Sequence, residues 1–149
     1  MTDEWPTLEG SCLCGAIRFR VRGPYTEREV CHCSLCRKLS GGGFTTTIAT
    51  YADNLEWLQR EANITSYYHS EIYTPNFCST CGSPVPLAGK AGYCFIPAGA
   101  LDTNVEIGVS KHLFAGSKAE WDEISDDAPR YAAFSPASIQ SASGADADG

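Results

Sequence analysis

The sequence has few basic residues and no long apolar run. Lys and Arg together number 11 against 18 Asp and Glu in 149 residues, so the formal net charge is −7 at pH 7. A chain with this charge lacks the general electrostatic footprint of a protein that binds nucleic acid or an anionic membrane surface. No apolar stretch approaches the roughly 18–20 residues that a membrane-spanning helix needs. We therefore expect no nucleic-acid partner and no membrane span.

The first ten residues also lack the features of a secretory signal. They include Asp3, Glu4 and Glu9, and they have neither a basic start nor an apolar stretch. We therefore expect a cytoplasmic protein, in which disulfide bonds are disfavoured. The apolar fraction of 43% is high enough for a packed core, and the length is typical of one domain.

Helical periodicity is weak throughout, and no repeat of solenoid length occurs. The segment 15–21 alternates Ile17, Phe19 and Val21 with arginines, which predicts a strand with one basic face. Short strands are also expected at residues 44–50, 54–58, 64–69, 93–97 and 106–109, with one helical turn at 34–39. The expected fold class is therefore mainly β with little helix.

Eight cysteines stand out in a sequence of this length. They form a pair, a triplet, a second pair and a single residue, which are Cys12 and Cys14, then Cys31, Cys33 and Cys36, then Cys78 and Cys81, then Cys94. In a reducing compartment, cysteines clustered in this way more often bind metal than form disulfides.

The number of thiolates in each group suggests two kinds of metal site. Structural zinc takes four protein ligands, whereas catalytic zinc takes three and keeps one open position. Two pairs make four thiolates and the triplet makes three, so ligand counting favours one closed and one open site. Spacing alone also allows the triplet to join one of the pairs, and it allows Cys78 and Cys81 to be a redox pair. Cys94 lies in an apolar run and is expected to be a buried, inert thiol.

The residues around these cysteines resemble one known family. The matching motifs are Gly10-Ser-Cys-Leu-Cys-Gly15, Cys31-His-Cys-Ser-Leu-Cys-Arg-Lys38 and Phe77-Cys-Ser-Thr-Cys-Gly82, followed by weaker matches at 96–102 and 111–131. They resemble the glutathione-dependent formaldehyde-activating enzymes, a family that also includes centromere protein V-like proteins. The resemblance covers residues 10–134, which are expected to form one zinc domain. Residues 1–9 are then a lead-in, and residues 135–149, rich in Ser, Ala, Gly and Asp, a disordered tail.

The resemblance implies a fold, a set of ligands and a reaction. The fold is the zinc-stapled β-tent of antiparallel sheets. The ligands implied are Cys12, Cys14, Cys78 and Cys81 for a structural zinc, and Cys31, Cys33 and Cys36 for a catalytic zinc. The reaction implied is that of a carbon–sulfur lyase, which joins a small thiol such as glutathione to an aldehyde, formaldehyde, as S-(hydroxymethyl)glutathione. This partition of the cysteines agrees with the one that ligand counting favours.

Other residues near the triplet are candidates for binding a substrate. Residues 10–40 carry six basic and two acidic side chains, so a small anionic ligand is expected to meet this part of the chain. Arg37 and Lys38 follow the triplet directly, and the glycines at 41–43 would let a peptide-like ligand approach the backbone. His32 and His112 are further candidates to face the cleft, although a structural role is the commoner one for such histidines.

Two other functions fit parts of the sequence. A non-catalytic zinc module that binds a protein partner would need the same cysteines, although the basic extension expected of a chromatin protein is missing. A reductase would use Cys94 as its nucleophile. The apolar surroundings of Cys94 argue against that role, because such surroundings raise the pKa of a thiol and so make it less reactive.

Overall fold

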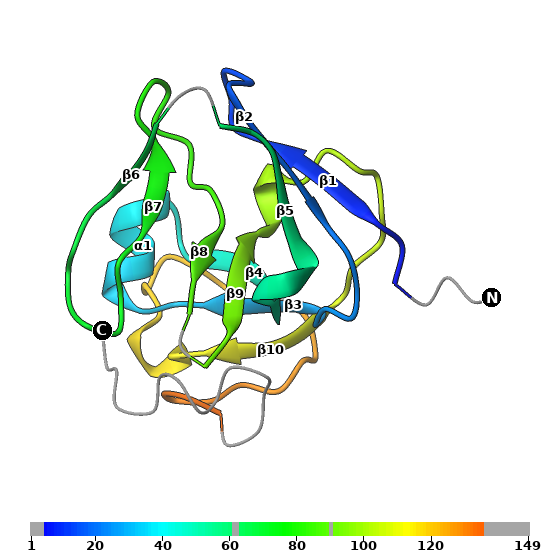
Figure 1. The fold of residues 1–149 in the computed structure, drawn as a ribbon. Coiled ribbons are helices and arrows are strands. Elements are labelled where there is room, and N and C mark those ends of the chain that lie inside the picture. Colours follow the sequence, from blue (N-terminus) through cyan, green and yellow to red (C-terminus); the bar gives the residue numbers. More distant parts are fainter. Residues whose placement is uncertain (1–4, 61–62, 90, 136–149) are drawn as a thin grey trace.

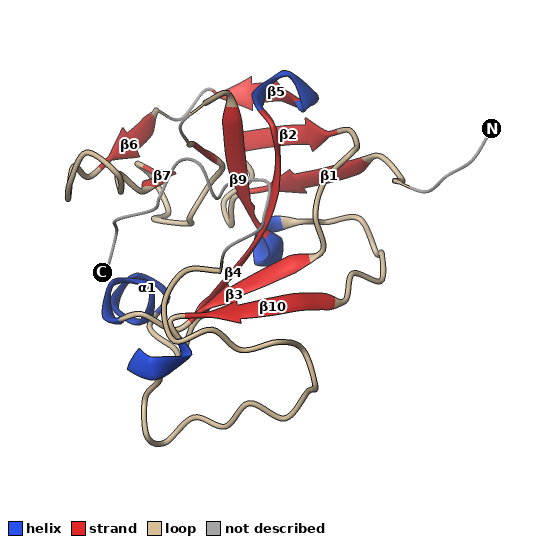
Figure 2. Ribbon diagram, turned by 90° about the horizontal axis from the view of Figure 1, so that it is seen from below, coloured by secondary structure: helices blue, strands red, loops and turns tan. Residues whose placement is uncertain are grey.

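The fold is seen in a computed structural model that describes residues 5–60, 63–89 and 91–135. Two β-sheets lie on either side of the main apolar core, and a small third sheet stands beside them (Figures 1 and 2). The expected fold class, mainly β with antiparallel sheets and little helix, is confirmed. The expected tail at 135–149 lies outside the described residues, apart from Ser135.

The first sheet has three antiparallel strands in the order β1-β2-β5, which are β1 (Leu8–Ser11), β2 (Ile17–Val21) and β5 (Leu55–Arg60). The second sheet has the order β10-β3-β4-β9-β8. Its strands are β3 (Arg28–Cys31), β4 (Thr45–Tyr51), β8 (Leu87–Ala88), β9 (Tyr93–Pro97) and β10 (Val109–Leu113). All its pairs are antiparallel except β10 with β3, which run parallel. The third sheet joins β6 (Ile64–Ser66) to β7 (Asn76–Cys78).

Helix is confined to short segments in the described part of the chain. The α-helix α1 spans Ser34–Ser40, at the predicted position, and three 3-10 turns lie at Ala52–Asn54, Ala98–Ala100 and Ala115–Ser117. With seven residues, α1 is far too short to cross a bilayer, and the same holds for every other helix in the ranges described.

The predicted alternation along β2 is confirmed. Ile17, Phe19 and Val21 have no exposed surface, and the arginines between them point to the other face. Arg20 lies opposite Glu9 on β1 and Glu56 on β5, at 2.9 and 3.3 Å. Because these cross-strand carboxylates pair with it, this part of the basic stretch is not a free binding face for an anion.

Several element boundaries differ from those expected. β1 begins at Leu8, within the segment expected to be a lead-in, and β6 ends at Ser66 rather than at residue 69. The strand expected at 106–109 is wrong, because the ladder starts only at Val109. In the segment before it, the carbonyl groups of Ile107 and Gly108 are bound by Arg28 instead, through its side chain and its backbone N–H.

The main core joins the two larger sheets. Leu8, Phe19 and Val21 of the first sheet pack against Ile48, Cys94 and Ile96 of the second. Two smaller apolar clusters contain the remaining buried cysteines. One holds Cys12 and Cys78 with Ile17 and Val85, and the other holds Cys33 and Cys36 with Leu113 and Phe114.

Gly10 on β1 lies against the Phe19 ring of β2 and the backbone of the Ala98–Ala100 turn, and its substitution tests this packing. A β-carbon on Gly10 would collide with the Phe19 ring and would lie 2.5 Å from the backbone oxygen of Ala100. We expect Gly10→Ala to lower the free energy of unfolding by about 1–3 kcal/mol, as overpacking of a core does. Urea unfolding followed by tryptophan fluorescence measures this change.

Gly99→Ala is the matched control, because nothing lies within 4 Å of a β-carbon at that exposed position. We expect its effect to stay within roughly 0.5 kcal/mol of the parent protein. Equal stability of the two variants would contradict the close approach at Gly10.

Candidate metal centres

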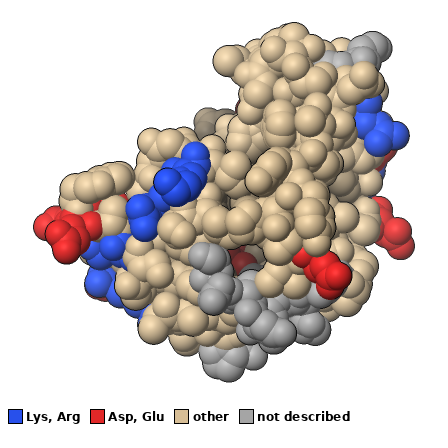
Figure 3. All heavy atoms as spheres, turned by 90° about the vertical axis from the view of Figure 1, so that its left-hand side faces the viewer, with Lys and Arg blue, Asp and Glu red and all other residues tan. Residues whose placement is uncertain are grey.

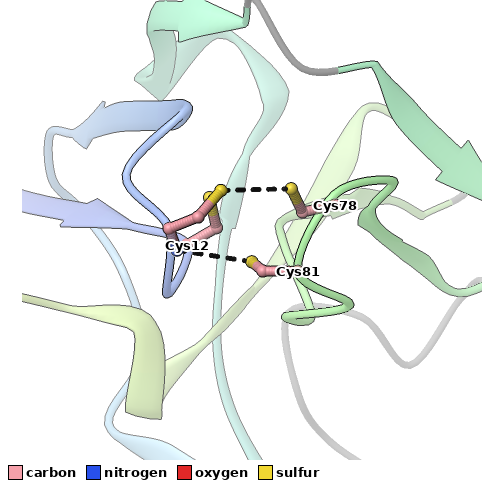
Figure 4. A group of neighbouring side chains, drawn as sticks. Cys12, Cys78 and Cys81 are labelled. Carbon is pink, nitrogen blue, oxygen red and sulfur yellow. Dashed lines mark hydrogen bonds between the residues drawn. The ribbon is translucent and has the colours of Figure 1, made fainter.

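Four cysteines from two distant parts of the chain meet at one point. Cys12 and Cys14 lie on the turn between β1 and β2, and Cys78 and Cys81 lie at the end of β7 and on the turn that follows it. All four sulfur atoms lie within 4.8 Å of one another. Figure 4 shows Cys12 opposite Cys78 and Cys81, with the side chains converging. We call this group the four-cysteine cluster.

Backbone N–H groups point at the sulfur atoms of this cluster. Ile17 N–H donates to Cys12 Sγ at 3.3 Å, and Thr80 N–H donates to Cys78 Sγ at 3.4 Å. Cys14 N–H crosses between the two turns and donates to Cys81 Sγ at 3.4 Å. Such bonds favour thiolate over thiol, because they add positive dipole ends around the sulfur.

Each turn of the four-cysteine cluster ends in a glycine with a left-handed backbone. The φ angles are +84° at Gly15 and +80° at Gly82, a region that residues with a β-carbon rarely adopt. The Cys78–Gly82 turn and the Cys12–Gly15 turn before β2 thus have equivalent ends. The hydroxyl of Ser83 also lowers the pKa of Cys81, to about 5.

The four-cysteine cluster fits a tetrahedral metal ion. A Zn–S bond of about 2.3 Å places the sulfur atoms of a tetrahedron about 3.8 Å apart. The sulfur atoms of Cys12 and Cys14 are 3.6 Å apart, and those of Cys14 and Cys78 are 3.9 Å apart. Separations near this value, together with the N–H donors, are what a structural thiolate site requires.

The three remaining clustered cysteines form a second group, the triplet. Cys31 ends β3, Cys33 is the N-cap of α1, and Cys36 lies in the first turn of that helix. Their sulfur atoms also lie within 4.8 Å of one another. In the described part of the chain no fourth Cys, His, Asp or Glu joins them.

Local hydrogen bonds favour charge on the triplet. The Cys36 N–H donates to Cys33 Sγ at 3.4 Å, as a side chain at an N-cap accepts from the first turn. The thiols of Cys31 and Cys36 also donate to Cys33, and they hold its pKa well below the usual range. The same contacts raise the pKa of Cys31.

Two residues beside the triplet were missed by the sequence analysis. Burial raises the pKa of Tyr73, and the three cysteines of the triplet raise it further, so its hydroxyl faces them. The side chain of Thr45 interacts with Cys36 from the start of β4. Thr45 follows the triplet closely enough to be suspected from sequence, but Tyr73 carries no local signal because it lies in the connection between β6 and β7.

The basic residues after the triplet are used in different ways. Arg37 donates to the backbone oxygen of Ser117 at 3.3 Å and so ties α1 to the turn after β10, whereas Lys38 is exposed.

Figure 3 shows the side of the molecule on which α1, β6 and β7 lie in Figure 1. That face is largely uncharged and hollowed near its middle, and basic side chains gather along one side.

The two candidate histidines are buried and bind each other. His32 Nε2 and His112 Nδ1 are 2.9 Å apart, and His112 Nε2 lies 2.9 Å from Asp126 Oδ1. Burial lowers the pKa of His32. Neither histidine belongs to a group of potential metal ligands among the residues that the structure describes.

Comparison with known proteins identifies the family of this chain. Residues 7–117 match the family profile described as glutathione-dependent formaldehyde-activating enzyme. The chain belongs to this family. A curated protein of Halomonas elongata named "Putative glutathione-dependent formaldehyde-activating enzyme" is 37% identical over 130 residues, which cover 78% of this chain and 80% of that protein.

The fold is shared with a protein of known structure. A crystal structure of a Rhodobacter sphaeroides protein superposes with a TM-score of 0.54 and 19% identity, over 68% of this chain and 98% of that one. The formaldehyde-activating family match ends at residue 117, so both cysteine groups lie inside it, whereas Asp122 and Asp126 lie beyond it.

The eighth cysteine stands apart from both groups in this member of the family. Cys94 is 2% exposed, lies in the main core with Ile48 and Ile96, and donates a hydrogen bond from its thiol to the backbone oxygen of Tyr51 at 3.9 Å. Burial raises the pKa of its thiol to about 11. The predicted burial of this thiol is confirmed, and a nucleophilic role for Cys94 is disfavoured.

The burial of Cys94 predicts its resistance to alkylation. At pH 8 a thiol with this pKa is only roughly 0.1% thiolate, and its sulfur is shielded from the reagent. We expect iodoacetamide to leave Cys94 unmodified in the folded protein over hours and to modify it in 8 M urea, as measured by peptide mass spectrometry. Modification in the folded protein at the rate seen in urea would contradict this packing.

Proposed function

We propose that the chain is a zinc-dependent enzyme that joins formaldehyde to a small thiol, glutathione or a close analogue. The addition is reversible, so the activity is that of a carbon–sulfur lyase. The observation that carries the proposal is the triplet, in which three thiols converge and no fourth Cys, His, Asp or Glu of the described residues joins them. Membership of the formaldehyde-activating family supports the same reaction.

We further propose that the two cysteine groups hold zinc in different roles. Cys12, Cys14, Cys78 and Cys81 would bind a structural ion, because four thiolates close its coordination. Cys31, Cys33 and Cys36 would bind a second ion with one position left for a ligand. Thiolate ligands favour zinc over harder cations such as magnesium or calcium.

The bound ion would supply a site where a thiol is held as its thiolate, which is scarce in free glutathione because a thiol pKa is near 8.5. The residues around the triplet then orient the two reactants. Tyr73 faces the triplet, and a phenol hydroxyl at that place donates a hydrogen bond to the oxygen of the aldehyde. Arg37, held beside the triplet by Ser117, contributes positive charge near an anionic thiol.

The alternative is a non-catalytic zinc module that binds a protein partner. It would need metal in both cysteine groups but no access of a small thiol to the triplet. The two functions therefore separate on activity and thiol binding rather than on metal content.

The two cysteine groups predict different consequences of losing one thiol. Cys12→Ser opens the site that joins the β1–β2 turn to the β7 turn, and structural zinc contributes on the order of 10 kcal/mol in small zinc peptides. We expect this variant to be largely unfolded or strongly destabilised in circular dichroism and thermal melting. Cys36→Ser should stay folded, with a loss of about one zinc per chain.

Cys94→Ser is the control for losing a cysteine outside both groups, and it should keep the full zinc content. Zinc-to-protein ratios by mass spectrometry check all three variants. A folded Cys12→Ser protein beside an unfolded Cys36→Ser protein would reverse the proposed roles of the two groups.

The reaction itself is tested by NMR exchange spectroscopy on glutathione mixed with formaldehyde. We expect the zinc-loaded protein to raise the exchange rate between glutathione and its hydroxymethyl adduct at least about 10-fold over the spontaneous rate. Cys36→Ser should lose this acceleration, and Tyr73→Phe should lower it while keeping both zinc ions. Full zinc loading without any acceleration would reject the enzyme and favour the non-catalytic module.

A further inference from the structure

A buried hydrogen-bond chain starts directly beside the triplet. His32, which lies between Cys31 and Cys33, is 1% exposed and meets His112 through the 2.9 Å contact of their ring nitrogens. His112, on β10, meets Asp126, whose side chain is 42% exposed and therefore reaches the surface. The chain of hydrogen bonds thus runs inward from Asp126 at the surface through His112 to His32.

The inner end of this chain has a polar atom without a partner. His32 Nδ1 is buried and makes no hydrogen bond within the described residues, and the same is true of Asp122 Oδ2. These two atoms are 3.9 Å apart, too far for a direct hydrogen bond. Buried polar atoms are nearly always satisfied, so a pair of this kind calls for a bridging group.

One water molecule satisfies both atoms, whether His32 Nδ1 accepts a hydrogen bond or carries the hydrogen itself. A water about 2.8 Å from each atom fits a separation of this size, and it has two hydrogens to donate. If His112 donates to Asp126 and accepts from His32, then His32 Nδ1 is an acceptor, and the water donates to it and to Asp122. If His32 Nδ1 carries the hydrogen instead, the water accepts it and donates to Asp122.

Asp122 is held in place to receive this water. A β-carbon on Gly43 would lie 2.6 Å from Asp122 Oδ2, so the carboxylate packs directly on the Gly43 backbone. Its backbone is fixed as well, since Asp122 N–H donates to Ala119 O at 3.1 Å. Lys118 Nζ donates to the carbonyl oxygens of both Ala119 and Asp122.

We propose that a single buried water bridges His32 Nδ1 and Asp122 Oδ2, and that the completed chain from Asp126 to Asp122 positions Cys31 and Cys33 for metal binding. His32 is bonded covalently to both cysteines, so fixing its ring fixes the backbone that presents two of the three thiols. Asp122 and Asp126 are then positioning residues that come from the segment after β10. The inference rests on the proposed function only in that the triplet must bind zinc.

The test compares two neutral substitutions of the same residue. Asp122→Asn keeps an oxygen that accepts from the water, whereas Asp122→Ala removes it, and both remove the same charge. We expect Asp122→Ala to weaken zinc binding at the triplet about 10-fold, the lower end of the effect of outer-shell partners, and Asp122→Asn to stay within about 3-fold of the parent. Competition with a graded series of zinc chelators measures both sites in one titration.

The four-cysteine cluster is the internal reference, and its zinc affinity should not change in either variant. Asp127→Ala, at a nearby exposed position, controls for the loss of a negative charge. Equal affinities in Asp122→Ala and Asp122→Asn, or equal weakening at both zinc sites, would overturn the inference. A parent protein that binds zinc only at the four-cysteine cluster would overturn the inference together with the proposed function.

A crystal structure of the zinc-loaded protein provides the direct readout. We expect density for one water within hydrogen-bond distance of both His32 Nδ1 and Asp122 Oδ2. A direct His32–Asp122 contact without water would contradict the bridge, even if the parent protein accelerates the reaction of glutathione with formaldehyde.

Discussion

The structure depends on the meeting of two turns that are far apart in the chain. The turns at residues 12–15 and 78–82 place four sulfur atoms within 4.8 Å of one another. The β1–β2 hairpin and the small β6–β7 sheet therefore have to meet at this point. Four thiolates this close repel one another unless a cation lies between them. The backbone N–H groups aimed at these sulfurs reduce that cost but do not remove it, which is why a metal ion suits this place.

The triplet meets a different constraint. Its three cysteines lie within six residues, at the junction of β3 and α1, and local backbone geometry alone brings them together. Cys33 acts both as a member of the triplet and as the N-cap of α1. Distant elements supply the surroundings instead, since Leu113 and Phe114 pack against these cysteines and Tyr73 faces them. The convergence of the three thiols is therefore a local property of the chain, whereas their surroundings depend on the tertiary fold.

The buried polar residues link these features to the segment after β10. Lys111 and Glu29 lie 3.9 Å apart, and Lys111 also donates to Ser135. His112 holds Asp126 through its ring and the backbone of Pro129 and Tyr131 through its own peptide groups. The parallel pairing of β10 with β3 places these groups next to the strand that leads into the triplet. These hydrogen bonds fix the segment together with the packing of Phe114, Tyr131 and Phe134 beside the triplet.

Much of this protein follows from its sequence. The period-two pattern at Ile17, Phe19 and Val21 specifies β2 and its buried face, and the cysteine spacing marks out two pairs and a triplet, because both signals are local. Tertiary structure decided what local patterns do not encode. The partners of Arg20, the position of Tyr73 beside the triplet and the alignment of His32, His112 and Asp126 depend on strand order and register. These contacts join residues that are distant in sequence, so they arise only when the sheets have packed.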